Sequence, residues 1–204
     1  MTGEPSWAGG REKPPAWTSG EGRTRFENPW LKVVEYDAIA PTGHQTHYGV
    51  VRFKQRAVGV LPLHEDGTVT LVAQHRFPLM NYAWEMPEGG VPFDEDPLDG
   101  ARRELREETG LTALDWRPIL ELELSNSTTD ETGICYLARD LTPGHADPDE
   151  TEDLDIVRVS FGAVLAEVIS GRIKDALTVA TVLRAYHMAR EGELPDDLAL
   201  SMLG

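Results

Sequence analysis

The stretch from Gly89 to Leu111 places the tightest constraint on the fold, because its second half has the marks of a short helix with defined ends. Asp96 is suited to accept hydrogen bonds from the first free N–H groups, and Pro97 suits the first helical position. Gly110 suits the left-handed residue that commonly ends a helix. The sequence therefore predicts a helix bounded by Asp96 and Gly110.

Three carboxylates share one stripe of this helix, since Glu104, Glu107 and Glu108 stand three and four residues apart. Like charges at these spacings destabilise an isolated helix by roughly 0.2–0.5 kcal/mol per pair, which favours a cation against them. Carboxylate oxygens are ligands that Mg²⁺ and Mn²⁺ accept readily. A solvated acidic face, partly neutralised by neighbouring arginines, is the alternative that the helix alone leaves open.

The spacing of the glycine, glutamate and arginine residues in this stretch resembles the signature of the Nudix hydrolases. Gly89 is followed after five residues by Glu95, and after seven more by the run Arg103–Leu111, so that every specified position of the signature is matched. The resemblance implies a metal-dependent hydrolase of phosphoanhydride bonds.

Strand-like runs lie on both sides of the signature, and two helical patterns follow it. The expected strands are residues 30–36, 47–54, 57–63, 68–75, 82–86, 116–124, 133–139 and 156–160, and the expected later helices are 161–169 and 175–190. A turn at Glu65–Gly67 predicts a hairpin between the third and fourth runs, and Pro87–Gly90 predicts a tight loop. This order predicts an α/β fold with a mixed sheet and helices on both faces, and the resemblance implies a Nudix-type α/β/α sandwich.

The chain divides into four expected segments. Residues 1–25, rich in Gly, Pro and charged residues, predict a flexible leader, and residues 193–204 predict a short frayed tail. Between them lie N-terminal strands at 26–56 and a catalytic domain at 57–192. The resemblance implies that the strands of 26–56 form a small antiparallel sheet that builds a homodimer.

Composition narrows the classes of function. The formal net charge of -16 disfavours binding to nucleic acids or to anionic membrane surfaces. The single cysteine, Cys135, lies in an apolar run and is expected to be a buried thiol, which is consistent with a cytoplasmic protein. No run of residues has the length and apolarity of a membrane span or a signal peptide.

The resemblance also assigns roles within the signature. Glu104, Glu107 and Glu108, with the backbone carbonyl of Glu88, would bind two or three Mg²⁺ or Mn²⁺ ions. Glu107 and Arg103 count as catalytic residues, and Arg103 would orient one of the glutamates. Glu95 would brace the loop that precedes the helix.

Other roles fall outside the signature. Glu150 and Glu152 occupy the loop that supplies the catalytic base in related ADP-ribose hydrolases, and the sequence does not decide between them. Arg76 resembles the arginine that meets the pyrophosphate, and bidentate geometry suits arginine to phosphate. Trp30 and Trp84 could stack on a nucleotide base, the alternative being that both pack in the core.

The span from about residue 28 to residue 190 resembles the branch of the family that acts on ADP-ribose and nucleoside-diphosphate sugars. The expected substrate is therefore a small nucleotide, cleaved to a nucleoside monophosphate and a sugar phosphate. Ser127 stands where the ADP-ribose subgroup has a proline. This difference weakens the case for strict ADP-ribose specificity and favours other nucleoside-diphosphate sugars such as GDP-mannose. Two alternatives are a housecleaning hydrolase of nucleoside triphosphates and a catalytically silent nucleotide sensor.

Overall fold

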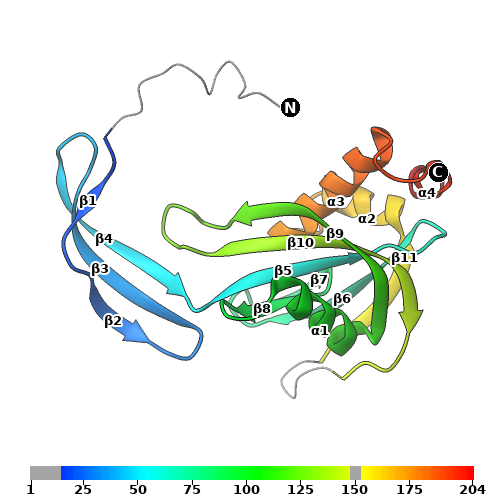
Figure 1. Cartoon of the computed structure of the whole chain (residues 1–204), viewed down its shortest axis with the longest axis horizontal. Coiled ribbons are helices and arrows are strands. Elements are labelled where there is room, and N and C mark those ends of the chain that lie inside the picture. The colour runs from blue at the N-terminus through cyan, green and yellow to red at the C-terminus, as the bar shows by residue number, and fades with distance from the viewer. Residues whose placement is uncertain (1–14, 148–152) are drawn as a thin grey trace. The chain divides into compact units, whose positions relative to one another are not determined.

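The computed structural model describes residues 15–147 and 153–204, which divide into two compact units. The smaller unit comprises the described residues up to Phe53 together with Ser127–Asp130. Its four strands are β1 (Thr18–Ser19), β2 (Arg23–Glu27), β3 (Leu31–Ile39) and β4 (Gln45–Phe53). β3 is central and antiparallel to the other three: β1 and β2 pair with its two ends, and β4 pairs along its whole length (Figure 1).

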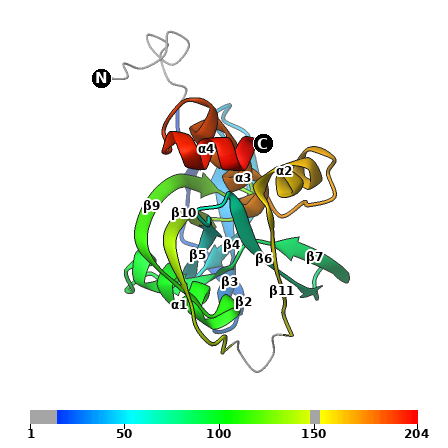
Figure 2. The same ribbon diagram turned by 90° about the vertical axis from the view of Figure 1, so that its right-hand side faces the viewer.

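The larger unit contains two sheets. One has the strand order β8–β5–β10–β9, with β5 and β10 parallel and the other pairs antiparallel. The second, with the order β11–β6–β7, is antiparallel throughout (Figure 2). The strands are β5 (Gln55–Pro62), β6 (Thr68–Arg76), β7 (Asn81–Glu85), β8 (Glu88–Pro92), β9 (Leu111–Glu123), β10 (Thr132–Pro143) and β11 (Asp155–Ser160).

The described part of the larger unit also has four helices, namely α1 (Pro97–Thr109), α2 (Phe161–Ile169), α3 (Ala176–Arg190) and α4 (Asp196–Leu203). α1 and α3 contact the strands of the first sheet, whereas α2 packs on β11 and α4 packs on α2 and α3. Alternation along the strands divides the core in two. Val58 and Val60 of β5 pack in a cluster with Leu105 of α1, whereas Leu61 belongs to the cluster that includes α2, α3, α4 and β6. Figure 1 accordingly shows α1 on one side of this sheet and α3 on the other. The predicted α/β/α sandwich with a mixed sheet is confirmed.

Several local predictions were wrong. The turn after β5 forms, but within the described residues the pairing there is a single antiparallel bridge between Leu63, just after β5, and Val69 of β6. The two strands belong to different sheets. The predicted loop at Pro87–Gly90 instead opens β8, because Glu88 to Pro92 pair with β5. The leader expected up to residue 25 contains β1 and the start of β2, since pairing with β3 satisfies their backbone groups.

The C-terminal tail is also ordered, contrary to prediction. Residues 196–203 form α4, in which Leu198, Ala199 and Met202 are buried in the larger core cluster. Spaced three and four apart, these residues present one apolar face, so burial stabilises a helix that is too short to persist alone. None of the described helices has the length and apolarity required to cross a bilayer.

Candidate active site

The ends of α1 are fixed by the residues that the sequence indicated. The Asp96 side chain accepts a hydrogen bond from the Leu98 N–H at 2.8 Å, and Pro97 occupies the first turn. Gly110 ends the helix with φ of 71° and donates its N–H to the Arg106 carbonyl at 2.8 Å. These caps hold the acidic stripe of the helix in a fixed register against β8.

Two of the signature glutamates lie against the first residues of β8. Glu108 is 2% exposed and accepts a hydrogen bond from the Glu88 N–H at 3.1 Å. Glu104 fills the space beside Gly89, where a Cβ would come 2.2 Å from its Cδ and 2.4 and 2.5 Å from its two carboxylate oxygens. Glycine at position 89 is therefore what allows the Glu104 carboxylate to approach the backbone that carries the Glu88 carbonyl.

Arg103 connects the third glutamate to this group. Its Nη1 donates to Glu104 Oε1 at 2.7 Å and to Glu107 Oε2 at 3.2 Å, while Nη2 donates to the Gly90 carbonyl at 3.4 Å. The Nε atom lies 3.8 Å from Glu95 Oε1. One guanidinium thus orients two of the glutamates and ties the helix to the strand.

A second acidic group, which the sequence did not reveal, lies next to the first. Glu85, Glu88 and Asp175 each place a ligand atom within 4.8 Å of the others. Among the described residues, the three signature glutamates do not form a group this close. Arg76 Nη2 lies between two of them, 2.5 Å from Glu85 Oε2 and 2.9 Å from Glu88 Oε1. Burial raises the pKa of the Glu88 carboxyl well above its usual value, and Asp175 and Glu85 raise it further.

The two groups share Glu88, whose backbone contacts Glu108 while its side chain contacts Arg76. Glu85 ends β7 directly after Tyr82, Ala83 and Trp84, and a carboxylate following this run is the sequence signal that could have found it. Asp175 carried no such signal, because its position 87 residues beyond Glu88 is decided by packing and it also serves as the N-cap of α3.

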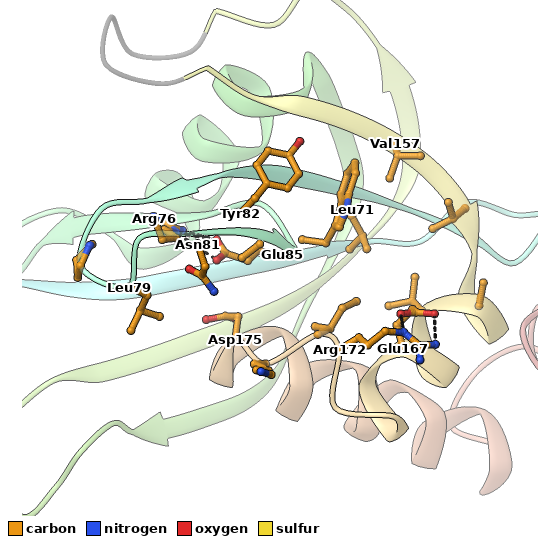
Figure 3. A pocket seen from close by; sticks show the side chains of 18 residues that line it. Leu71, Arg76, Leu79, Asn81, Tyr82, Glu85, Val157, Glu167, Arg172 and Asp175 are labelled. Carbon is orange, nitrogen blue, oxygen red and sulfur yellow. Dashed lines mark hydrogen bonds and ion pairs between the residues drawn. The ribbon is translucent and has the colours of Figure 1, made fainter.

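The other predicted residues are placed as follows. Arg76 binds carboxylates in this structure, so a phosphate would compete with Glu85 and Glu88 for it. Trp84 lines a cavity of about 740 Å³ formed by β6, β7, β11, α2 and the segment before α3 (Figure 3). Trp30 lies in the smaller unit and is 61% exposed. Glu150 and Glu152 lie outside the described residues.

The donor atoms suit a divalent cation. Glu104 and Glu108 offer carboxylate oxygens at the start of β8, and Glu107 is held beside Glu104 by Arg103. In the second group the Arg76 guanidinium already supplies a cation, so a metal would have to displace it. The signature glutamates therefore fit a metal better than the second group does.

Comparison with known proteins agrees with this geometry. The model of the NUDIX domain matches residues 53–177. A methanol dehydrogenase activator of Bacillus methanolicus is 30% identical over 159 residues, covering 77% of this chain and 85% of that protein. An ADP-ribose pyrophosphatase of Bacillus subtilis is 31% identical over the same length, with the same coverage of both chains.

A solved structure of an ADP compounds hydrolase superimposes with a TM-score of 0.79, covering 90% of this chain and all of that one at 20% identity. This likeness concerns the fold. The mixed sheet between helices, together with the capped helix and its glutamates, is the arrangement of one class of hydrolases. The chain belongs to the NUDIX family.

Proposed function

We propose that the protein hydrolyses the pyrophosphate bond of ADP-ribose or a related nucleoside-diphosphate sugar in a divalent-metal-dependent reaction. The products would be a nucleoside monophosphate and a sugar phosphate. The observation that carries the proposal is the contact of Glu104 and Glu108 with the first two residues of β8. The B. subtilis relative, an ADP-ribose pyrophosphatase matched over 85% of its length, supports the substrate class.

The contacts described above support a role for each residue. Glu104, Glu107 and Glu108, with the Glu88 carbonyl, would hold Mg²⁺ or Mn²⁺, which when bound polarises phosphoryl oxygens and lowers the pKa of water. Arg103 keeps two of these carboxylates oriented through its Nη1 atom. Burial of Glu108 excludes bulk water from its carboxylate and so strengthens its interaction with any cation.

Several further assignments stay predictions. Glu150 or Glu152 would take the proton of the attacking water, and Arg76 would contact the pyrophosphate. A homodimer would form through the strands of residues 26–56, with the catalytic domain at 57–192. A cytoplasmic location is expected from the single buried thiol.

Replacing Glu108 with glutamine tests the proposal. Glu108→Gln keeps the size of the side chain but removes the negative charge, so we expect kcat on ADP-ribose to fall by at least about 100-fold. Product chromatography should show AMP and ribose 5-phosphate for the wild type, and thermal unfolding should show that the variant is folded. Glu123→Gln, an exposed site on β9, is the matched control and should keep full activity. A folded Glu108→Gln enzyme with undiminished turnover would refute the metal assignment.

A further inference from the structure

Arg76 presents two edges of its guanidinium group, and Glu85 occupies only one of them. Arg76 Nε donates to the two Glu85 carboxylate oxygens at 2.9 and 3.2 Å, and Nη2 donates to Glu85 Oε2 at 2.5 Å. Nη2 carries two hydrogens, and the one that points toward Nε makes this bond. The other hydrogen faces Nη1, so the edge between Nη1 and Nη2 is left for a second acceptor.

The Glu88 side chain takes this second edge. Its Oε1 accepts a hydrogen bond from Arg76 Nη2 at 2.9 Å. Glu88 begins β8, whose backbone is held by pairing with Gly59 of β5 and by the hydrogen bond from the Glu88 N–H to Glu108. Because the backbone is held on both counts, the side chain starts from a set position beside Arg76.

Charge balance does not account for this contact. Glu85 alone matches the positive charge of Arg76, and its side chain is only 5% exposed. Glu88 and Asp175 place further carboxyl groups within 4.8 Å of Glu85. The other carboxyl oxygen of Glu88, Oε2, is buried without a hydrogen-bond partner among the described residues. Pairing with Arg76 therefore recovers only part of the cost of burying Glu88, which indicates a purpose other than stability.

A phosphate group needs the edge that Glu88 occupies. Two oxygens of a phosphate bind a guanidinium best through two N–H groups of one edge. The edge bound by Glu85 is closed, because that carboxylate is buried and bonded to both Nε and Nη2. The Arg76 side chain is 34% exposed and lines the cavity of Figure 3, so a ligand can reach it. Glu88 must release Nη2 before a phosphate can bind there bidentately.

This contact lies within one residue of the proposed metal ligands. The Glu88 N–H meets Glu108, and Glu104 fills the space beside Gly89. A diphosphate bound beside these residues therefore competes with Glu88 for the N–H groups of Arg76.

We propose that the Glu88 side chain sets how tightly the protein binds phosphate groups, by competing with them for the second edge of Arg76. The inference rests on the proposed function for its substrate and on the predicted contact between Arg76 and the pyrophosphate. The Glu88 side chain acts through Arg76, so it is a positioning group. Competition weakens the binding of substrate and product alike, which favours release of the phosphate products after each turnover.

Glu88→Ala tests the proposal, because it removes the acceptor and leaves the backbone N–H that Glu108 binds. At saturating Mg²⁺ we expect KM for ADP-ribose to fall about tenfold, since the substrate no longer has to break a charge-assisted hydrogen bond. Calorimetric titration with inorganic pyrophosphate and Mg²⁺ should show its Kd falling by the same factor, and inhibition by the products should strengthen. Glu123→Ala, at an exposed site of β9, is the control and should change none of these values.

Glu88→Gln separates the contact from the charge. Glutamine keeps an oxygen that can accept from Arg76 Nη2 but carries no charge, so the gain in affinity should be smaller than with alanine. If glutamine gives the full gain of alanine, the effect comes from charge and the competition is refuted.

Removing Arg76 provides the second comparison. Arg76→Met is combined with Glu85→Gln, because Glu85 is buried and would otherwise be left without a cation. In this background Glu88→Ala should change the pyrophosphate Kd by less than about twofold, because no guanidinium is left to compete for. Arg76→Lys is another background, in which an ammonium group keeps a cation at Glu85 but has no planar edge, and the gain should again be lost. Thermal unfolding checks that each variant is folded.

The outcomes separate the two proposals. Tighter pyrophosphate binding in Glu88→Ala that requires Arg76, in a protein that hydrolyses no nucleotide sugar, supports the competition and refutes the proposed function. Hydrolysis of ADP-ribose in which Glu88→Ala changes neither KM nor pyrophosphate affinity, or in which its gain persists without Arg76, overturns the competition and leaves the proposed function standing.

Discussion

The contact between Gly89 and Glu104 allows the geometry of the signature glutamates to be tested with a single methyl group. In Gly89→Ala the new Cβ would lie 2.2–2.5 Å from the Glu104 carboxylate. Ordinary contacts between non-bonded heavy atoms begin at about 3.4 Å, so the carboxylate must move by roughly 1 Å. The substitution therefore displaces one proposed metal ligand and changes no charge.

The cost should appear in catalysis rather than in stability. Moving a catalytic group by about 1 Å relative to the reacting atoms can lower the rate by about 100-fold. The atoms that would clash are the far end of a flexible side chain, so we expect the free energy of unfolding to change by less than about 1 kcal/mol. Gly89 does not have a positive φ, so alanine is compatible with its backbone.

The assay is the initial rate of ADP-ribose hydrolysis over a range of Mg²⁺ concentrations, with thermal unfolding measured on the same samples. We expect a lower kcat and a higher Mg²⁺ concentration for half-maximal activity. Gly162→Ala is the control, because its Cβ would meet nothing closer than 3.8 Å, and it should keep full activity.

A second substitution sharpens the test. Glu104→Asp shortens the side chain by one methylene, so the double variant Gly89→Ala/Glu104→Asp should recover part of the activity that Gly89→Ala loses. If Gly89→Ala retains the wild-type rate and Mg²⁺ dependence, the position of Glu104 against β8 is not required and the reasoning fails.

Three further predictions concern the fold. Burial raises the pKa of Cys135 to about 11, so at pH 8 about one thiol in 1,000 is ionised, and iodoacetamide should label it only after unfolding, as mass spectrometry would show. The pKa of this thiol is higher in the folded protein than in the unfolded chain, where it is about 8.5. The thiol therefore contributes its full stability below about pH 8.5, and this contribution is lost as the pH rises toward about 11. Unfolding measured against pH should show this loss in the wild type and not in Cys135→Ala. Met202→Ala should lower the free energy of unfolding by about 2–5 kcal/mol, because Met202 is buried. Leu200→Ala is the control: this side chain is 72% exposed, so the change should be less than about 0.5 kcal/mol. Equal effects of the two substitutions would contradict the packing of α4. Asp96→Ala removes the N-cap of α1 and should cost about 0.5–2 kcal/mol in chemical denaturation, while an unchanged midpoint would show that the cap is dispensable.

The sequence by itself determined the local features of the catalytic helix. Asp96, Pro97 and Gly110 set its ends because caps act within one turn of the chain. The spacing of Glu104, Glu107 and Glu108 set the acidic stripe, because the period of a helix is fixed. The apolar runs at residues 57–63 and 133–139 likewise predicted strands, and the order of elements predicted a mixed sheet with helices on both faces.

Only the tertiary structure decided what those elements meet. Glu104 lies against Gly89 and Glu108 binds the Glu88 backbone because β8 pairs with β5, where the sequence had indicated a loop. Glu85 and Asp175 converge through packing of β7 against the start of α3, ninety residues further along the chain. α4 exists because burial of three side chains offsets the entropy of ordering a short helix. Such contacts join residues that are far apart in the sequence. Helix and strand periodicity relate only residues a few positions apart, so no local pattern predicts these contacts.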